Sequence, residues 1–425
     1  MPRSTILTLP LFAILGCGNP PPSSSPTTVS MTPVVIVPGN PETIPTATRA
    51  PFEPPPPSEV AKPSAIDERK SDPKAEKEAE KYVTKFGGVV IRDVSHFSRG
   101  QPVFAILLSE KDCTGFELKK LAVFPKLHRL TLSGTKNTDT ILKQLPDLPN
   151  ITLVSLEGSD ATDAGLAAVA ALPQLKELDV MRAEKLTAGG FKALAASKTL
   201  ETLNATETAI NDISIRDLGA IKTLSTLTLK GTKVTLADTG AAFSGWTKLA
   251  RLDLTDTGVG DSALVPIGVA KGLVELRLEG ANVTDAGLKP LAKLTKLKVL
   301  HLGRCAKITG VGLNDLADLS GLETIYLNDT ALNDAGMAAV AKARGVKTLD
   351  LDRTKVTDAG VKELATPRAL ESLSFEETMV GDAALIAVAE KAKKLEKVGV
   401  RKSKVTERGG SEARTKANNL SVNFD

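Results

Sequence analysis

Hydrophobic residues recur in one frame from Val103 to near the C-terminus, with a period of 24 or 25 residues. The clearest copy runs Leu273-Val-Glu-Leu-Arg-Leu, then Val283-Thr-Asp-Ala-Gly-Leu, then Leu291 and Leu294. A fixed period of this length is the signature of a stacked array, in which each copy packs only against its neighbours. Thirteen copies, the first and last weaker, begin at Val103, Leu127, Ile151, Leu175, Leu200, Leu224, Leu249, Leu273, Leu297, Leu322, Val346, Leu370 and Leu395.

Each copy predicts a short strand followed by a turn that carries a hydroxyl group. In the pattern Leu-x-x-Leu-x-Leu, alternate side chains point inward from an extended chain. A hydroxyl three residues after the last of these leucines can bond backbone groups where the chain leaves the strand. The series is interrupted in four copies, at Lys111, Ala183, Ala281 and Cys305. Its members are Thr135, Ser159, Thr208, Thr232, Thr257, Thr330, Thr354, Thr378 and Ser403.

The second half of each copy predicts a short helix. The motif Val-Thr-Asp-Ala-Gly-Leu supplies a Thr or Asp that can cap the start of a helix. The following Leu-x-x-Leu-Ala gives that helix one buried face. We expect the glycines of the motif to let neighbouring backbones approach closely; they are Gly165, Gly190, Gly287, Gly312, Gly336 and Gly360.

Each copy supplies a strand and then a helix, and right-handed crossovers connect them to the next copy. This arrangement places a parallel sheet on the inside of an arc and the helices on its outside. The pattern resembles the ribonuclease-inhibitor-like and cysteine-containing leucine-rich repeats, and the copy from Leu297 to Leu313, with Arg304-Cys305-Ala306, is nearest to the cysteine-containing form. The resemblance covers residues 103–419 and implies an α/β solenoid, a horseshoe with a concave parallel sheet and convex helices. Most copies lack that cysteine and no F-box-like segment is present, so a ubiquitin-ligase adaptor role is not carried over.

Both ends of the array need covers, because terminal copies expose apolar faces. Residues 74–102 form the predicted N-terminal cap, with a helix over Lys74–Phe86 and a strand over Gly88–Val94. Residues 420–425 form the predicted C-terminal cap, a last strand over Leu420–Phe424.

Residues 1–17 have the features of a secretory signal: Arg3, the apolar run from Ile6 to Leu15, and a small residue before Cys17. The run is too short to span a bilayer. Ile14-Leu15-Gly16-Cys17 resembles the lipobox of bacterial lipoproteins, in which signal peptidase II cuts before a lipid-modified cysteine. This resemblance implies secretion across the inner membrane and a lipid anchor on Cys17 in the cell envelope, at the outer membrane or facing the periplasm. The alternatives are an ordinary secretory signal and a buried apolar strand.

Residues 18–73 carry 15 of the chain's 25 prolines, with Ser and Thr between them. Such a segment cannot pack a core and favours extended conformations. We therefore expect a disordered tether, which holds the folded part roughly 40 to 170 Å from the membrane.

Composition and charge narrow the functions further. Net charge is +4, acidic and basic residues are interspersed, and only 3% of residues are aromatic. A continuous basic stripe with interleaved aromatics is not evident in the sequence, so we expect no nucleic-acid partner. Three cysteines are too few for a disulfide scaffold. Cys113 and Cys305 fall eight copies apart, about 40 Å, whereas a disulfide needs Cα atoms within about 7 Å.

The candidate binding surface consists of the strand residues that do not point inward. Arg and Tyr commonly anchor protein interfaces, which favours the middle and later copies. The alternative is a face kept polar for solubility, whose charges (Arg251, Glu275 and Arg277 among them) pair across strands. The predicted residues are Arg251, Asp253, Glu275, Arg277, Glu279, His301, Tyr326, Asn328, Asp350 and Asp352, with Arg304, Asp329 and Arg353 one position further along.

No catalytic, metal or cofactor site is predicted. His301 has no second histidine in a neighbouring copy, and no Cys–His spacing fits zinc. Asp253, His301 and a hydroxyl could imitate a hydrolase trio, but that chemistry needs a sheltered nucleophile and an oxyanion hole. The chain also lacks a phosphate-binding G-x-x-x-x-G-K-[ST] loop.

We therefore expect a non-enzymatic protein-binding module displayed on the bacterial envelope, with a protein ligand and no small-molecule substrate. The alternatives are a passive structural or adhesive envelope component, an intracellular leucine-rich-repeat scaffold whose leader is not processed, and an enzyme with an unrecognised site on the concave face.

Overall fold

The computed structural model describes residues 72–92, 101–110, 112–365, 369–417 and 419–424, all within the compact unit Glu59–Asp425. The predicted signal, the lipidation site and the predicted tether as far as residue 71 lie outside the described residues, whereas the last two residues assigned to the tether, Asp72 and Pro73, belong to the start of helix α1. Within the described part of the chain, no helix has the length and apolar character needed to cross a membrane.

Fifteen strands of the described chain form one sheet, in which spatial order follows chain order. The thirteen strands β2–β14 belong to the thirteen predicted copies and run parallel. The strands are β1 Val89–Arg92, β2 Val103–Leu107, β3 Arg129–Thr131, β4 Leu153–Ser155, β5 Glu177–Asp179, β6 Thr202–Asn204, β7 Thr226–Thr228, β8 Arg251–Asp253, β9 Glu275–Arg277, β10 Val299–His301, β11 Thr324–Tyr326, β12 Thr348–Asp350, β13 Ser372–Ser374, β14 Lys397–Gly399 and β15 Ser421–Asn423.

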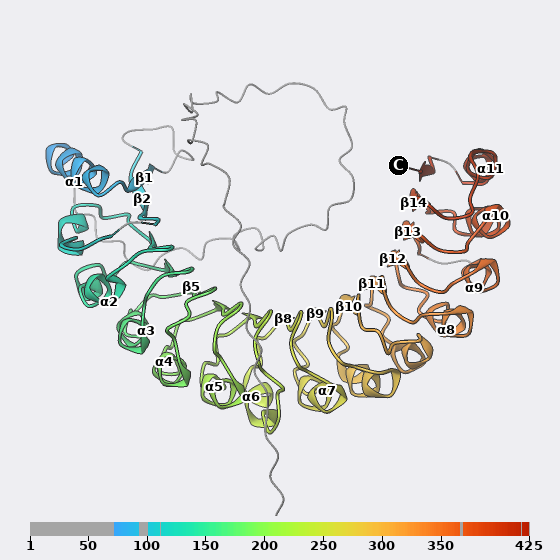
Figure 1. Ribbon diagram of the computed structural model, residues 1–425, viewed down its shortest axis with the longest axis horizontal. Coiled ribbons are helices and arrows are strands. Elements are labelled where there is room, and N and C mark those ends of the chain that lie inside the picture. Colours follow the sequence, from blue (N-terminus) through green and yellow to red (C-terminus); the bar gives the residue numbers. More distant parts are fainter. Residues whose placement is uncertain (1–71, 93–100, 111, 366–368, 418, 425) are drawn as a thin grey trace, which may run out of the picture. The chain divides into compact units, whose positions relative to one another are not determined.

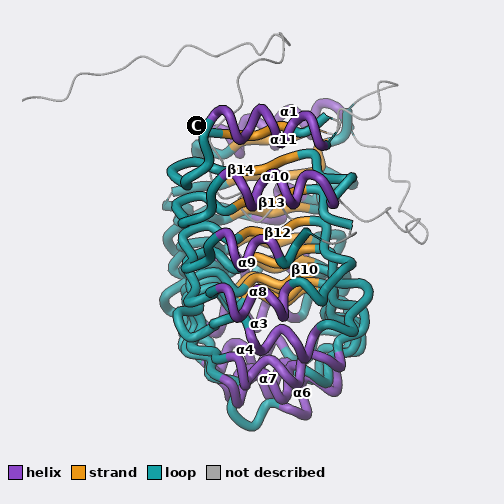
Figure 2. Tube along the Cα trace, turned by 90° about the vertical axis from the view of Figure 1, so that its right-hand side faces the viewer, coloured by secondary structure: helices purple, strands orange, loops and turns teal. Residues whose placement is uncertain are grey.

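The sheet lines the inside of an arc and the helices line its outside, as the sequence predicts (Figure 1). Loops form the two sides of the arc, flanking the strands (Figure 2). Four helical segments are 3-10 rather than α. The helices are α1 Pro73–Lys85, η1 Leu118–Leu121, α2 Thr138–Leu142, η2 Leu145–Asp147, α3 Asp163–Ala170, α4 Ala188–Leu194, α5 Asp212–Leu218, α6 Gly240–Gly245, α7 Asp261–Ile267, η3 Asp285–Lys293, η4 Val311–Leu316, α8 Asp334–Val340, α9 Asp358–Lys362, α10 Asp382–Lys391 and α11 Glu407–Lys416.

The predicted leucine frame forms one continuous core between sheet and helices. In the copy that begins at Leu273, for example, Leu273, Leu276 and Leu278 are fully buried. Aliphatic side chains of nearly constant size fill each thin layer, which explains why so few aromatic residues suffice. Trp246 is the largest fully buried side chain among the described residues, and its indole Nε1 donates to the Leu218 carbonyl at 3.1 Å.

The predicted hydroxyl series is confirmed at eight of its nine positions as turn bonds to the carbonyl three residues earlier, whereas the Ser159 hydroxyl instead accepts from the Ala161 amide at 3.5 Å. The Thr232 hydroxyl donates to the carbonyl of Leu229, three residues earlier, at 2.6 Å, and equivalent bonds recur along the array. At one interruption, the Cys305 thiol donates instead to the Leu278 carbonyl of the preceding copy. Both Cys305 and Cys113 are buried and unpaired.

Threonines and aspartates at the helix starts make two kinds of bond, one within a copy and one between neighbouring copies. The threonine caps its own helix: the Thr357 hydroxyl accepts from the Ala359 amide. The aspartate bridges to the next copy, since Asp334 accepts the amide and the hydroxyl of Thr357 at 2.8 and 2.7 Å. The series of aspartates with such inter-copy bonds is Asp139, Asp163, Asp212, Asp261, Asp285, Asp334 and Asp382.

The in-register glycines make room for these bridges. A Cβ on Gly360 would lie 2.4 Å from the Asp334 carboxylate oxygen of the preceding copy. At Gly336 the obstacle is backbone, the Thr309 carbonyl oxygen at 1.9 Å. The prediction of close backbone approach therefore holds at Gly336 and at Gly312, where the Asp285 carbonyl oxygen lies at 2.3 Å; at Gly360 the nearest obstacle is the side chain, with the Asp334 Cα next at 2.9 Å.

Both predicted caps have the expected elements. Helix α1 begins after Asp72, whose carboxylate accepts from the Lys74 amide. The cap strand β1 is antiparallel to β2 and begins at Val89, one residue later than the predicted span Gly88–Val94, whose last two residues lie outside the described residues. At the other end, β15 adds a parallel strand beside β14.

Candidate functional site

Five of the predicted binding residues form one row across the concave face of the sheet. The parallel register aligns Asp253, Arg277, His301, Tyr326 and Asp350, which end strands β8 to β12. Arg251 and Glu275 form the start of a second row. Glu279, Asn328 and Asp352 follow two residues after the ends of their strands. The structure thus brings together ten residues spread over about 100 positions of sequence.

A stacked aromatic pair occupies the middle of this row. The rings of His301 and Tyr326 lie 4.3 Å apart between centroids, at an interplanar angle of 16°. Two carboxylates flank the imidazole, with Glu275 Oε1 3.7 Å from Nε2 and Glu279 Oε1 3.7 Å from Nδ1. His301 is only 7% exposed. A packed aromatic pair beside carboxylates suits contact with a partner's aromatic or cationic side chain.

The strand charges of this face do pair, as the alternative interpretation expected. Arg277 Nε lies 2.6 Å from Glu275 Oε1, and Arg251 Nε lies 3.6 Å from Glu275 Oε2. Such pairs fix side-chain positions while contributing little net stability at a solvated surface. They are compatible with either a solubilising face or a preorganised binding face.

Asp350 and Asp352 make the acidic end of the row unusual. Burial first, and the neighbouring Asp352 carboxylate second, raise the pKa of Asp350 to about 7. Burial also raises the pKa of Asp352, against hydrogen bonds from the Ser374 hydroxyl at 2.5 Å and the Glu376 amide at 2.7 Å. Burial and the Asp350 charge together raise the pKa of the Tyr326 phenol. Keeping two carboxylates close together and half-buried costs folding free energy.

Beside the concave face, each copy holds one residue in the left-handed backbone region. These residues include the three predicted to lie one position further along: Arg304, Asp329 and Arg353, with φ of 61°, 58° and 52°. Arg353 bonds both carboxylate oxygens of Asp329, at 2.6 and 2.7 Å. Arg304 reaches over Gly280 to Asp256 at 2.7 Å. Only these three members of the column were predicted from the sequence, although glycine at Gly134, Gly158, Gly231 and Gly280 signals a left-handed position.

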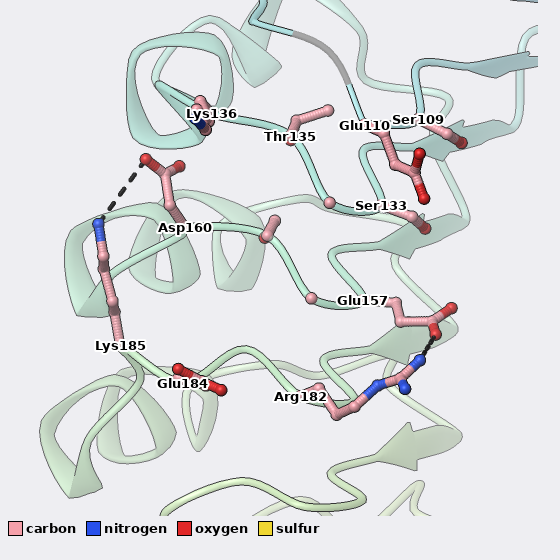
Figure 3. A pocket seen from close by; sticks show the side chains of 13 residues that line it. Ser109, Glu110, Ser133, Thr135, Lys136, Glu157, Asp160, Arg182, Glu184 and Lys185 are labelled. Atoms are coloured by element: carbon pink, nitrogen blue, oxygen red, sulfur yellow. Dashed lines mark hydrogen bonds and ion pairs between the residues drawn. The ribbon is translucent and has the colours of Figure 1, made fainter. Parts of the chain in front are cut away.

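Where that column contains two consecutive glycines, the side of the arc is hollowed (Figure 3). Gly134 and Gly158 contribute no side chains, which leaves an open depression of about 770 Å³. Charged residues border it, and two ion pairs cross its wall: Arg182 with Glu157, and Lys185 with Asp160 at 3.8 Å. This depression was not predicted from the sequence, because the predicted binding residues lie on later copies. Its lining carries charges of both signs.

A metal site is not indicated in the described portion of the chain, where no three His, Cys, Asp or Glu side chains are grouped to hold an ion. His301 and Asp253 end strands β10 and β8, with Arg277 of β9 between them. The imidazole lies beside the Glu275 and Glu279 carboxylates and the Tyr326 ring.

Comparison with known proteins agrees with this architecture. A leucine-rich-repeat family model matches residues 293–317 and 346–365. An internalin from Listeria monocytogenes is similar in structure, with a TM-score of 0.57 and 18% identity over 84% of this chain and 95% of that one. A leucine-rich-repeat protein from Leptospira interrogans gives a TM-score of 0.43 and 16% identity, over 72% and 92% of the two chains. No curated protein sequence matches significantly. The fold is that of a leucine-rich-repeat solenoid.

Proposed function

We propose that the chain is a non-enzymatic protein-binding module, displayed on the bacterial cell envelope by a lipid anchor on Cys17, and that its ligand contacts the concave face. The observation that carries the proposal is the stacked pair of His301 and Tyr326, set in a row of charged side chains on a parallel sheet. A sheet of leucine-rich repeats presents a rigid surface whose outward residues are free to vary without disturbing the core.

Preorganisation supports binding over a purely solubilising role. The Arg277 guanidinium is held by Glu275, and the Tyr326 ring is held by His301. Side chains already fixed lose little conformational freedom when a partner docks, which favours affinity. Tyr and Arg are also the residue types that most often carry binding energy at interfaces.

The envelope location rests on the sequence of the leader and tether. An acylated Cys17 followed by a proline-rich segment would let the array sample a wide volume above the membrane. The likeness of the repeats to the ribonuclease-inhibitor-like and cysteine-containing subfamilies rests on copies such as the one from Leu297 to Leu313. The second candidate function, a passive structural or adhesive component, is favoured by the charge pairing of Arg251 and Arg277 with Glu275.

The binding face is tested by capture from solubilised envelopes. Wild type is compared with Arg277→Ala/Tyr326→Ala/Asp350→Asn and with a matched control on the same face, Glu177→Ala/Thr202→Ala/Thr226→Ala on β5, β6 and β7. We expect one or more envelope proteins to be recovered by wild type and the control, and about tenfold less by the first variant. Equal recovery from all three would exclude this face, and no saturable partner at all would favour the passive role.

The anchor is tested separately by metabolic labelling with a clickable palmitate analogue. Wild type should take up the label and fractionate with membranes, whereas Cys17→Ser should do neither. A wild-type chain that remains unlabelled, with its leader uncleaved by mass spectrometry, would favour the intracellular scaffold instead.

A further inference from the structure

A line of basic side chains runs along one side of the arc, where each helix returns to the next strand. Backbone bonds align this junction from copy to copy, as in Lys298 N to Val274 O and Val274 N to Ala250 O, both 2.8 Å. In each copy, the residue that makes these bonds, such as Ala250, Val274 or Lys298, is the aligned position. None of the copies has an acidic residue two or three positions before it. Eight copies have a cation there within the described chain: Lys126, Lys198, Lys222, Lys248, Lys271, Lys296, Arg344 and Lys394. We call these eight residues the basic side.

Six members of the basic side are exposed and have no charge partner among the described residues. The side chains of Lys198, Lys248, Lys271, Lys296, Arg344 and Lys394 make no hydrogen bond or ion pair with any described residue. The cations of the left-handed column differ, since Arg182, Arg304 and Arg353 are each paired with a carboxylate.

The aligned position itself carries four carboxylates, at Glu201, Glu323, Glu371 and Glu396, against the eight cations of the basic side and the aligned Lys176, Lys298 and Lys347; two of the four carboxylates are paired. Glu201 lies 3.3 Å from Lys176, and Glu323 is shared between Lys298 at 4.0 Å and Lys347 at 3.2 Å. The basic side therefore keeps a surplus of positive charge, although acidic and basic residues are well mixed along the sequence. Stacking creates the line, because residues about 24 positions apart become neighbours one strand spacing, roughly 5 Å, from each other.

The shape of this side suggests what it contacts. Figure 2 shows that the loops of successive copies form a side running along the whole array, beside the strands. A side of this kind can bring several of these unpaired cations to a planar surface at once. A nucleic-acid strand would be expected to meet exposed aromatic rings for stacking, and the exposed large hydrophobic side chains of the described chain include no aromatic.

We propose that the basic side binds an anionic lipid surface, so that the array can lie against phosphate-bearing headgroups. Each lysine close to such a surface strengthens partitioning roughly fivefold, and the attraction decays within about 10 Å at 0.1 M salt. This contact is independent of the acyl anchor. It would set the orientation of the array, with the concave sheet roughly perpendicular to the membrane and open to a partner from the side.

Vesicle co-sedimentation tests the proposal, using the full chain with Cys17→Ser so that no acyl group contributes. Vesicles contain phosphatidylcholine alone or with 30% phosphatidylglycerol. The test variant is Lys198→Gln/Lys248→Gln/Lys271→Gln/Lys296→Gln. The matched control removes four exposed lysines from the opposite side: Lys136→Gln/Lys233→Gln/Lys307→Gln/Lys355→Gln. Circular dichroism and thermal melting confirm that all three chains fold alike.

We expect the parent chain to bind the anionic vesicles, to ignore phosphatidylcholine and to be released by 0.5 M salt. The test variant should bind several hundredfold more weakly, since each of its four lysines contributes roughly fivefold, and the control should stay within about threefold of the parent. Binding that is indifferent to lipid charge, or equal losses in both variants, would overturn the proposal. So would lysine-dependent binding to a 30-nucleotide DNA without binding to the vesicles.

Discussion

Replacing Asp350 by asparagine should stabilise the protein above neutral pH. The carboxyl is half-buried, and burial together with Asp352 raises its pKa to about 7. In the unfolded chain the same group ionises near its ordinary value of 3.8. Between these two pH values the folded state holds a proton that the unfolded state has released, so stability falls as pH rises. Asparagine mimics the protonated acid and avoids this loss.

The size of the effect follows from the same values. A difference of about three pH units at 1.36 kcal/mol each gives roughly 4 kcal/mol as an upper limit. Partial solvation and adjustment of the Asp350–Asp352 pair should leave about 2 kcal/mol. The hydrogen bond from the Asp352 amide to Asp350 Oδ1, at 3.0 Å, is retained because the asparagine side chain offers the same oxygen. At roughly 2 cal/mol/K per residue, this gain raises the melting temperature by about 3 °C.

The assay is urea and thermal denaturation at pH 4.5 and pH 8. Asp350→Asn should match wild type at pH 4.5 within about 0.5 kcal/mol and exceed it at pH 8. Asp253→Asn is the control for the substitution itself, because Asp253 makes the same turn bond, to the Thr255 amide at 2.8 Å. A gain of equal size at both pH values, or no gain at pH 8, would refute the reasoning. If Asp350 contacts the ligand, the stabilised variant should also bind more weakly, a trade common at functional sites.

Three further predictions concern the array itself. Asp261→Ala should lower the free energy of unfolding by about 2 kcal/mol, because it removes two bonds to Thr284 of the next copy, both 2.7 Å. Gly280→Ala should cost about 1–2 kcal/mol, since φ is +72° there and a Cβ would lie 2.5 Å from Asp256 Oδ1; both losses are measured by urea denaturation. Burial raises the pKa of the Cys305 thiol to about 11, so native protein at pH 8 should leave it unmodified by a colorimetric disulfide reagent, and urea should expose it.

Matched variants separate these effects from general damage. Thr284→Ser keeps both bonds to Asp261 and should stay close to wild type. Gly258→Ala lies outside the left-handed region and has no neighbour closer than 3.9 Å, so it should be nearly neutral. Full stability of Asp261→Ala or Gly280→Ala would show that neighbouring copies adjust freely, and rapid native labelling of Cys305 would show that its copy opens locally.

The strand and helix pattern was predictable because each copy repeats the same local chemistry. Leu276 and Leu278 alternate as a half-buried strand requires, and Thr232 follows its strand at the distance that permits the bond to Leu229. Since every copy packs on a near-identical neighbour, the local pattern also fixes the long-range contacts. The antiparallel direction of the cap strand β1 was not predictable, because β1 precedes the repeating frame.

The sequence predicted which residues of the candidate site point outward from the sheet. It did not predict how their side chains contact one another. Strand alternation identified His301 and Tyr326 as outward, but only the register of β10 and β11 decides that their rings stack. The sequence likewise shows Asp350 and Asp352 two residues apart, whereas their burial, and with it the pKa of about 7, depends on neighbouring copies.

What the sequence alone determined is the solenoid: its period, its caps, its buried frame and the outward row of each strand. These features follow from local patterns, because each copy packs against neighbouring copies of nearly the same sequence. Only the tertiary structure decided which side chains of different copies meet. The Asp334–Thr357 bridges, the left-handed column and the basic side all join residues 23 or more positions apart. Their properties depend on distances between copies, which no single copy encodes.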